Sequence, residues 1–391
     1  MKHFPSLPVR LLRMGIIGIL AVVTVLPVTA QRAQPSSDED LEFWGSPSAY
    51  LNYQAKIAYP LIDRMLKAFP PAVEPDINRR MALIALDQFL HDADYDRRNA
   101  FGTFFNTRMA HMLEGIDNPL STGIRIYKLY NSGFIIRTPE TTVAIDLVPG
   151  GMSNKPFLSD SAVSEIVRRC AALIITNTDK SHANRSIAWT FAGEGKKVIL
   201  PEELWTNLDG DIVRIGADTE QTIDLAGMKL HLLPGHNGQT ANSICVMDFN
   251  GRGVVAHTGA QDNEADLEWI DRIHTRYDID VLLTKTQSPD LEAIITGFKP
   301  DTVITCHENE LENTFDKRES YWITQKRMKN LANLNVPNVI MTWGEAYDCG
   351  NSIADTQEDT STGTSKRIGR DGILYIKRNG AIYTPAGIKV N

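Results

Sequence analysis

The stretch A-L-I-I-T-N-T-D-K-S-H, residues 172–182, contributes most to the prediction of the fold. Its first four residues form an apolar run of the length and composition of a buried strand. Seven polar or small residues follow, from Thr176 to His182, and the segment 183–189 has the pattern of a helix start. The sequence therefore predicts a strand, a polar loop and a helix in direct succession.

Strands and helices alternate on both sides of this stretch. Short strands are predicted at 124–130, 133–136, 142–146, 197–200, 243–249, 253–256, 280–283 and 302–305, with two hairpin-like pieces at 211–233. Helices are predicted at 162–169, 265–275 and 319–333. Strand-rich and strand–helix texture in two similar halves predicts two sheets covered by outer helices.

The parts before and after this region have a different texture. Helices are predicted at 47–69, at 76–90 and around an aromatic and methionine stripe that includes Phe101, Phe105 and Met112, which we expect to face the core. Asn379-Gly380 between alternating apolar residues predicts a hairpin near the end. We therefore divide the chain into a helical N-terminal region at 31–120, a main domain at 121–348, a linker at 349–366 and a C-terminal β tail at 367–391.

Residues 1–30 have the features of a signal peptide. Arg10 and Arg13 precede an apolar stretch at 14–28, and Val28 and Ala30 are small residues at the positions that a signal peptidase reads. We expect a mature chain that begins at Gln31 and is periplasmic, secreted or on the cell surface, without a membrane span after cleavage. An uncleaved anchor is the alternative.

Charge and cysteine content narrow the function classes. The formal net charge is -8 and no Lys/Arg-rich run occurs, which argues against a nucleic-acid partner. The four cysteines include no C-x-x-C pair, so no zinc ribbon or thioredoxin-like site is predicted. Cys245 and Cys306 lie in apolar runs and are predicted to be buried free thiols. No G-x-S-x-G, P-loop, dinucleotide-binding glycine fingerprint or H-E-x-x-H motif is present.

Four further pieces occur in a fixed order around the 172–182 stretch. They are Ile145-Asp146, Leu233-Pro234-Gly235-His236, the run V-V-A-H-T-G-A at 254–260, and V-I-T-C-H at 303–307. With the loop at 176–182 they resemble the metallo-β-lactamase superfamily. The resemblance implies an α/β fold, a four-layer αββα sandwich, and metal-dependent hydrolysis of lactams, thioesters, lactones or phosphodiesters.

The resemblance also implies which residues stand at the positions of the family's metal ligands. His182, His236 and His307 match ligand positions. Four positions have changed: Asn177 and Asp179 stand where the family has histidines, Ser181 where it has an aspartate, and Ala260 where it has the bridging aspartate. Asp179 retains an oxygen donor, and Asp262 lies two residues beyond Ala260. The candidate metal ligands are His182, His236, His307, Asp179 and Asp262.

Each retained histidine has a structural alternative. His182 is placed to cap the following helix or to form a hydrogen bond with a backbone carbonyl. His236 can instead be an inherited turn residue. His307 has Glu308 and Glu310 nearby for a salt link, whereas His257 matches no ligand position and is predicted to be a packed histidine.

Three hypotheses for function follow. The first is a degenerate hydrolase relative without the dinuclear site, which binds an unknown small molecule or has an unknown role. Across the hypotheses we expect no metal or a single zinc or iron ion. The second is an active hydrolase with a rebuilt mononuclear site, since catalytic zinc commonly takes three protein ligands and water. The third is a surface or interaction module. No catalytic residue is assigned.

Overall fold

The computed structural model describes residues 47–152, 155–349, 364–368, 374–378, 381–383 and 389–390. The predicted signal peptide and most of the predicted linker lie outside the described residues. The chain divides into two units, residues 1–53 and 54–391. Of the first unit only the start of helix α2 is described. The remaining description concerns the second unit.

Three long helices precede the sheets, where the sequence predicted them. They are α2 (Pro47–Ala68), α3 (Ile77–Leu90) and α4 (Ala100–Asp117). Asp76 begins α3 because its side-chain oxygen accepts the Asn78 amide hydrogen at 2.7 Å, which satisfies one free donor of the first turn. The predicted aromatic stripe of α4 is buried, and the ring of Phe101 meets the indole of Trp343 at 5.5 Å in an edge-to-face arrangement.

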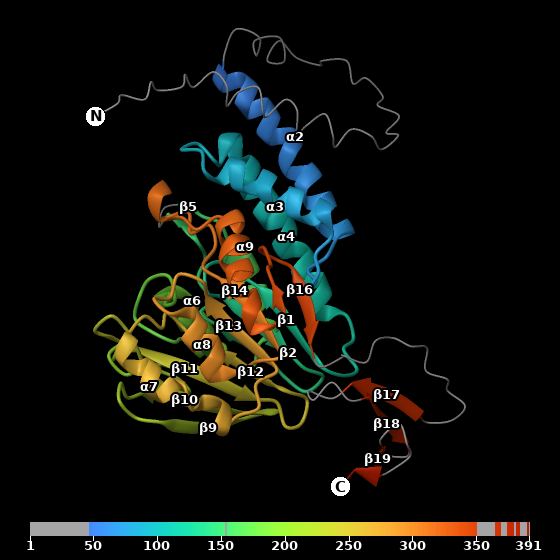
Figure 1. Cartoon of the computed structure of the whole chain (residues 1–391). Coiled ribbons are helices and arrows are strands. Elements are labelled where there is room, and N and C mark those ends of the chain that lie inside the picture. Colours follow the sequence, from blue (N-terminus) through green and yellow to red (C-terminus); the bar gives the residue numbers. More distant parts are fainter. Residues whose placement is uncertain are drawn as a thin grey trace, which may run out of the picture. The chain divides into compact units, whose positions relative to one another are not determined.

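Two seven-stranded sheets form the main domain (Figure 1). In each sheet an antiparallel part turns into a parallel part, at β3–β6 in the first and at β12–β13 in the second. The first sheet has the order β16 (Ala346–Cys349), β1 (Ile124–Lys128), β2 (Phe134–Arg137), β3 (Thr142–Ile145), β6 (Ala172–Ile174), β7 (Lys197–Pro201) and β8 (Ile212–Ile215). The second has the order β15 (Asn338–Val339), β14 (Thr302–Cys306), β13 (Val281–Lys285), β12 (Val254–His257), β11 (Thr240–Asp248), β10 (Met228–Asn237) and β9 (Gln221–Leu225).

Side chains alternate along these strands between separate cores. Ile126 and Ile174 of the first sheet share a core with Leu283 of the second, so the two sheets face each other. Their neighbours Tyr127 and Leu173 point the other way, into a core with the helices α2 to α4, α5 (Asp160–Arg169) and α6 (Arg185–Gly193). The outer face of the second sheet packs on α7 (Leu267–Ile270), α8 (Leu291–Phe298) and α9 (Tyr321–Asn330). This arrangement confirms the predicted four-layer αββα sandwich.

Two predicted elements differ in extent from those observed. The helix predicted at 265–275 is only the four residues of α7 between the 3-10 turns Glu264–Asp266 and Ile273–Thr275. The predicted hairpin β18 (Leu374–Arg378) and β19 (Ala381–Tyr383) is present, but it belongs to a four-stranded antiparallel sheet with β17 (Thr364–Ile368) and β20 (Lys389–Val390). β17 starts inside the stretch predicted as linker.

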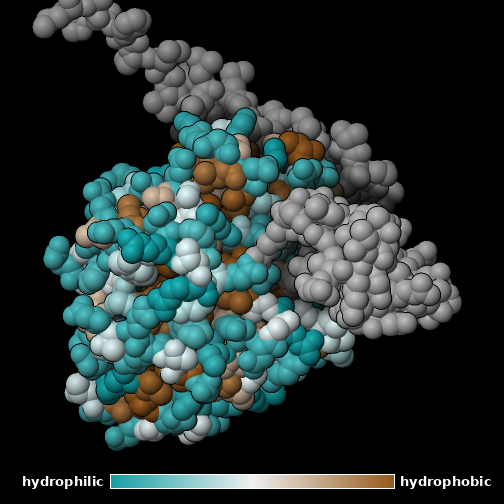
Figure 2. All heavy atoms as spheres, turned by 60° about the horizontal axis from the view of Figure 1, so that its bottom comes forward, coloured by the Kyte–Doolittle hydropathy of each residue, from teal (hydrophilic) through white to brown (hydrophobic). Residues whose placement is uncertain are grey.

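The surface and the cysteines agree with an ordinary globular domain. The face turned forward in Figure 2 is mostly hydrophilic with small hydrophobic patches. All four cysteines are buried and free, as predicted for Cys245 and Cys306. Within the described part of the chain, no helix combines the length and the apolar character that a membrane crossing requires. Short elements complete the fold: β4 (Gly151–Met152), β5 (Lys155–Pro156) and the 3-10 turns Arg97–Asn99, Phe315–Lys317 and Ala332–Leu334.

Candidate functional site

Four polar segments meet where strands of the two sheets end. Asp146 follows β3, Thr176 follows β6, Thr258 follows β12 and His307 follows β14. The carboxyl ends of parallel strands meet at one edge of a sheet, so strand order places Asp146 near Thr176 in the first sheet and Thr258 near His307 in the second, and the packing of the two sheets brings the pairs together. Asp146 and His307 adopt left-handed backbone conformations, with φ of 47° and 70°. Such conformations are costly for residues other than glycine and concentrate at functional sites.

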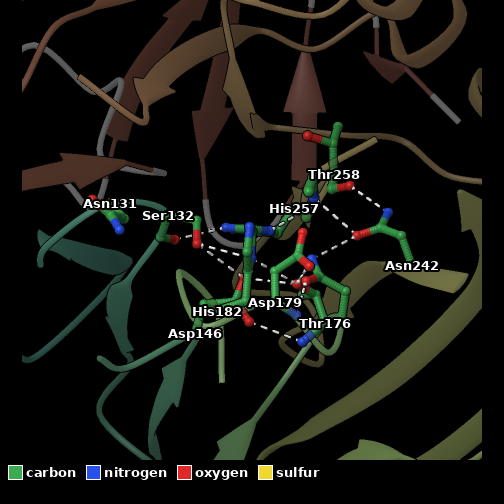
Figure 3. Close-up of polar contacts among 12 residues, drawn as sticks. Asn131, Ser132, Asp146, Thr176, Asp179, His182, Asn242, His257 and Thr258 are labelled. Carbon is green, nitrogen blue, oxygen red and sulfur yellow. Dashed lines mark hydrogen bonds and ion pairs between the residues drawn. The ribbon is translucent and has the colours of Figure 1, made fainter. Parts of the chain in front are cut away.

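Asp146 is the centre of a buried hydrogen-bond network. Its Oδ1 accepts the Thr176 amide hydrogen at 2.8 Å, and its Oδ2 accepts the Thr176 hydroxyl at 2.7 Å. Oδ2 also accepts the Nδ1 hydrogen of His182 at 2.7 Å and the Ser132 hydroxyl at 3.2 Å. Figure 3 shows these four side chains pointing toward one another. Burial alone raises the pKa of Asp146, but the nearby His182 and these hydrogen bonds outweigh it, so the pKa is lowered.

His182 is therefore fixed in one orientation. A carboxylate can only accept, so the Nδ1 atom of His182 carries the proton. The side chain is 1% exposed, and its Nε2 atom is buried without a hydrogen-bond partner. Neither structural alternative for His182 is observed, because its Nδ1 atom bonds a carboxylate rather than a backbone carbonyl, and Asn184 is the residue that caps α6.

His307 has a similar arrangement on the opposite sheet. Its Nδ1 atom bonds Glu310 Oε1, and its Nε2 atom is buried without a partner. The rings of His182 and His307 lie 5.1 Å apart. Burial lowers the pKa of His307 and favours the neutral imidazole. The pairing of His307 with a nearby glutamate that the sequence suggested as an alternative is thus present, as a hydrogen bond to Glu310.

Two imidazoles with carboxylate partners on Nδ1 and buried Nε2 atoms without a hydrogen-bond partner have the features of metal ligands. Carboxylates commonly hold metal-binding histidines in this way. The fit to a metal is incomplete, because zinc takes three or four protein ligands. Among the residues that the structure describes, no group of three or more His, Cys, Asp or Glu side chains is placed to hold an ion.

His236 lies outside this pair. Its Nδ1 atom is 3.1 Å from both oxygens of Asp266, its Nε2 atom is 4.0 Å from Asp218 Oδ1, and the side chain is 31% exposed. No contact between described residues joins it to His182 or His307. The structure therefore brings two of the three predicted histidines together, and a ligand role for His236 stays a prediction.

The two predicted aspartate ligands have other partners. Asp179 is exposed and accepts the Asn237 side-chain amide at 2.8 Å. Asp262 Oδ2 is 3.3 Å from the ammonium of Lys285, and the backbone amide of Asp262 donates a hydrogen bond to the carbonyl of His236 at 2.8 Å. Both aspartates thus lie near the end of β10, which carries His236. The Asp179 carbonyl accepts the His182 amide hydrogen at 2.8 Å, but no side-chain contact between described residues joins either aspartate to His182 or His307.

Asn177 and Ala260, two of the four positions that differ from the family pattern, take part in a network of amide groups. Asn177 Nδ2 donates to Asn242 Oδ1 at 3.2 Å, and the same oxygen accepts the Ala260 amide hydrogen at 2.9 Å. Asn242 Nδ2 donates to the Thr258 carbonyl at 2.9 Å. A side chain on Gly259 would approach Asn242 Oδ1 to 2.2 Å, so no space is left there. The Asn177–Asn242 network thus consists of neutral amide groups, which bind zinc weakly.

One member of the site, Asn242, lies within β11, and no local sequence pattern marks it. Glu310, which the sequence suggested only as a salt-link partner of His307, lies in the loop after β14. Ser132 lies in the turn between β1 and β2 and is fully buried. His257 is packed as predicted: its Nε2 donates to the Ser132 carbonyl at 2.9 Å and its Nδ1 accepts the Gly259 amide hydrogen at 2.8 Å.

No family model and no curated protein matches the sequence. Solved structures match parts of the chain at low identity. A possible metal-dependent hydrolase from Veillonella parvula has a TM-score of 0.46 at 15% identity, over 58% of this chain and 100% of that chain. The metallo hydrolase Igni18 from Ignicoccus hospitalis has a TM-score of 0.43 at 18% identity, over 57% and 97%.

A protein of the metallo-β-lactamase superfamily from Thermotoga maritima has a TM-score of 0.31 at 13% identity, over 52% of this chain and 85% of that chain. Likeness at this level does not assign an activity, so the function has to be argued from the residues of the site.

Proposed function

We propose that this chain is an exported metallo-β-lactamase-fold protein, related to hydrolases, that lacks the dinuclear metal centre and has a binding role. The Asn177–Asn242 network is the observation that supports this proposal. It accepts the Ala260 amide hydrogen where the resemblance implies imidazole and carboxylate ligands. The side chain of Ala260 is a methyl group, which has no atom that can bind a metal, and neutral amides bind zinc or iron weakly. If the chain is exported, the protein recovered from a periplasmic fraction should have the mass of a chain that begins at Gln31.

A hydrolase with one metal ion is the second candidate. The free, buried Nε2 atoms of His182 and His307 favour it. A metal held there would supply an activated water and polarise the bond to be cleaved. Asp179, Asp262 and His236 are the further ligands that the sequence suggests, and each would have to leave its present partner to reach the ion.

Metal content separates the two candidates. The mature protein is incubated with excess zinc, dialysed and measured by elemental analysis. The degenerate site predicts well below one equivalent, and two equivalents would contradict it. One equivalent that is lost in His182→Ala and kept in His111→Ala would support the mononuclear site. His111 is the matched control because it is an exposed histidine of α4.

Hydrolysis gives a second, independent test. We expect turnover of generic β-lactam, lactone and phosphodiester substrates to stay at background, because general acid–base help and a metal-activated water would both be missing. General acid–base help alone contributes about 100- to 10,000-fold to the rate, and the activated water adds to this. The combined variant Asn177→His, Asp179→His, Ser181→Asp and Ala260→Asp restores the family pattern and should gain metal and activity. Turnover by the unmodified protein that His307→Ala abolishes would show that the degenerate interpretation is wrong.

A further inference from the structure

A surface pocket lies on the other side of the second sheet, around the short helix α7. Its volume is about 270 Å³, and it is lined by Glu220, Pro234, Trp269, Arg272, Ile273 and Arg276. None of these residues belongs to the network of His182 and His307. The residues 269, 272, 273 and 276 have the spacing that places side chains on one face of a helical segment. The acidic neighbours Glu268 and Asp271 fall outside this set.

The two arginines of this pocket differ in their partners. Arg276 is held by Glu220 through two bonds of 2.7 and 2.8 Å, which neutralises its charge and fixes its position. Arg272 is exposed, and no described residue forms an ion pair or side-chain hydrogen bond with its guanidinium. The pocket therefore has one uncompensated positive charge with donors suited to a planar anion.

The indole of Trp269 forms an ordered apolar wall of the pocket. Its Nε1 atom donates to Asp266 Oδ1 at 3.2 Å, and the buried Asp266 also accepts from Gln261 at 2.8 Å. The polar edge of the indole is thus occupied, and its remaining surface is apolar. Pro234 and the buried Ile273 add further apolar lining.

From this pocket we infer a binding site for a small planar carboxylate, in which Arg272 binds the carboxylate and Trp269, Pro234 and Ile273 contact an aromatic or similarly flat body. A guanidinium and a carboxylate form paired, charge-assisted hydrogen bonds. An indole packs with another ring for about 0.5–1.5 kcal/mol beyond the area that it buries. The volume of about 270 Å³ accommodates a ligand with one ring.

Benzoate is the probe for this site, and benzamide is its neutral counterpart of the same shape. Titration calorimetry with EDTA present removes any contribution from metal. Benzoate should bind the full mature chain, and benzamide should bind at least about tenfold more weakly, because only the carboxylate pairs with Arg272. Arg272→Gln should weaken benzoate binding by a similar factor and remove the preference over benzamide.

Two further variants give the controls. Arg80→Gln removes an exposed arginine outside the pocket and should leave benzoate binding unchanged. Trp269→Leu should weaken both probes, and its thermal unfolding shows whether the fold is kept. Equal binding of benzoate and benzamide, or an Arg272→Gln effect no larger than that of Arg80→Gln, would overturn the inference. The same holds if benzoate fails to bind at about 10 mM, a concentration that detects even weak ligands.

Discussion

The carboxylate of Glu345 is predicted to be one of the largest single contributors to the stability of this protein. It lies in the turn before β16 and joins the first sheet to the helices that cover it. Arg79 of α3 binds both of its oxygens, at 2.8 and 2.6 Å, and Arg108 of α4 is 3.2 Å from Oε1. Its Oε2 also accepts the amide hydrogen of Thr342 at 2.8 Å. The side chains of the three charged residues are 1% to 4% exposed.

Glu345→Gln keeps the shape of this side chain and removes its charge. Arg108 retains Asp63 at 2.9 Å, but Arg79 is left buried without an anionic partner. Removing one partner of a buried ion pair typically costs about 3–5 kcal/mol, which is a large part of a total stability of roughly 5–15 kcal/mol. We therefore expect the urea midpoint of the variant to fall sharply, as followed by circular dichroism at neutral pH.

Asp348→Asn is the matched control because it removes the anion of a neighbouring but exposed pair. Asp348 is 2.5 Å from Arg125, and its side chain is 45% exposed, so its loss should cost about 0–1 kcal/mol. Replacing both Arg79 and Glu345 by methionine should recover most of the loss, because no unpaired buried charge remains at Arg79. The reasoning is refuted if Glu345→Gln costs no more than Asp348→Asn.

Three further predictions concern the interior. Burial lowers the pKa of His257 to about 4, so His257 stays neutral in the native state, whereas the unfolded chain takes up a proton there below about pH 6.5. This contribution to stability is therefore lost as the pH falls from about 6.5 to 4. An NMR titration of His257 with a midpoint near pH 6.5 would disprove this prediction. Gly259→Ala should cost about 1–3 kcal/mol more than Gly251→Ala, because both positions have positive φ but only the first would press a side chain against Asn242. Similar losses for both in urea unfolding would argue against a closed amide network. Burial raises the pKa of the Cys170 thiol to about 12, and the other three thiols are also buried, so a thiol reagent should modify none in the native protein and all four in urea.

Much of the fold was predictable from local patterns. Alternating strand and helix patterns predicted two sheets, although β15 and β16 were not predicted. The predicted bounds of α2 and α3 agree with the structure, and α4 contains the predicted aromatic stripe. The helix predicted at 265–275 was too long, because Trp269, Ile273 and Arg276 have helical spacing although the backbone is α-helical only over α7. Spacing of side chains does not distinguish one long helix from a short helix flanked by 3-10 turns.

The sequence by itself determined the order of the strands and helices and the position of the polar loop after β6, since both depend on residues that are neighbours in the chain. Only the tertiary structure decided the partners of the site. Asp146 binds His182 across 36 residues, and His307 meets His182 from the opposite sheet, whereas His236, which belongs to the same set of motifs, pairs with Asp266 instead. The reason is that strand order brings distant side chains to one edge, and each buried polar group then takes the nearest compatible partner, which no local pattern specifies.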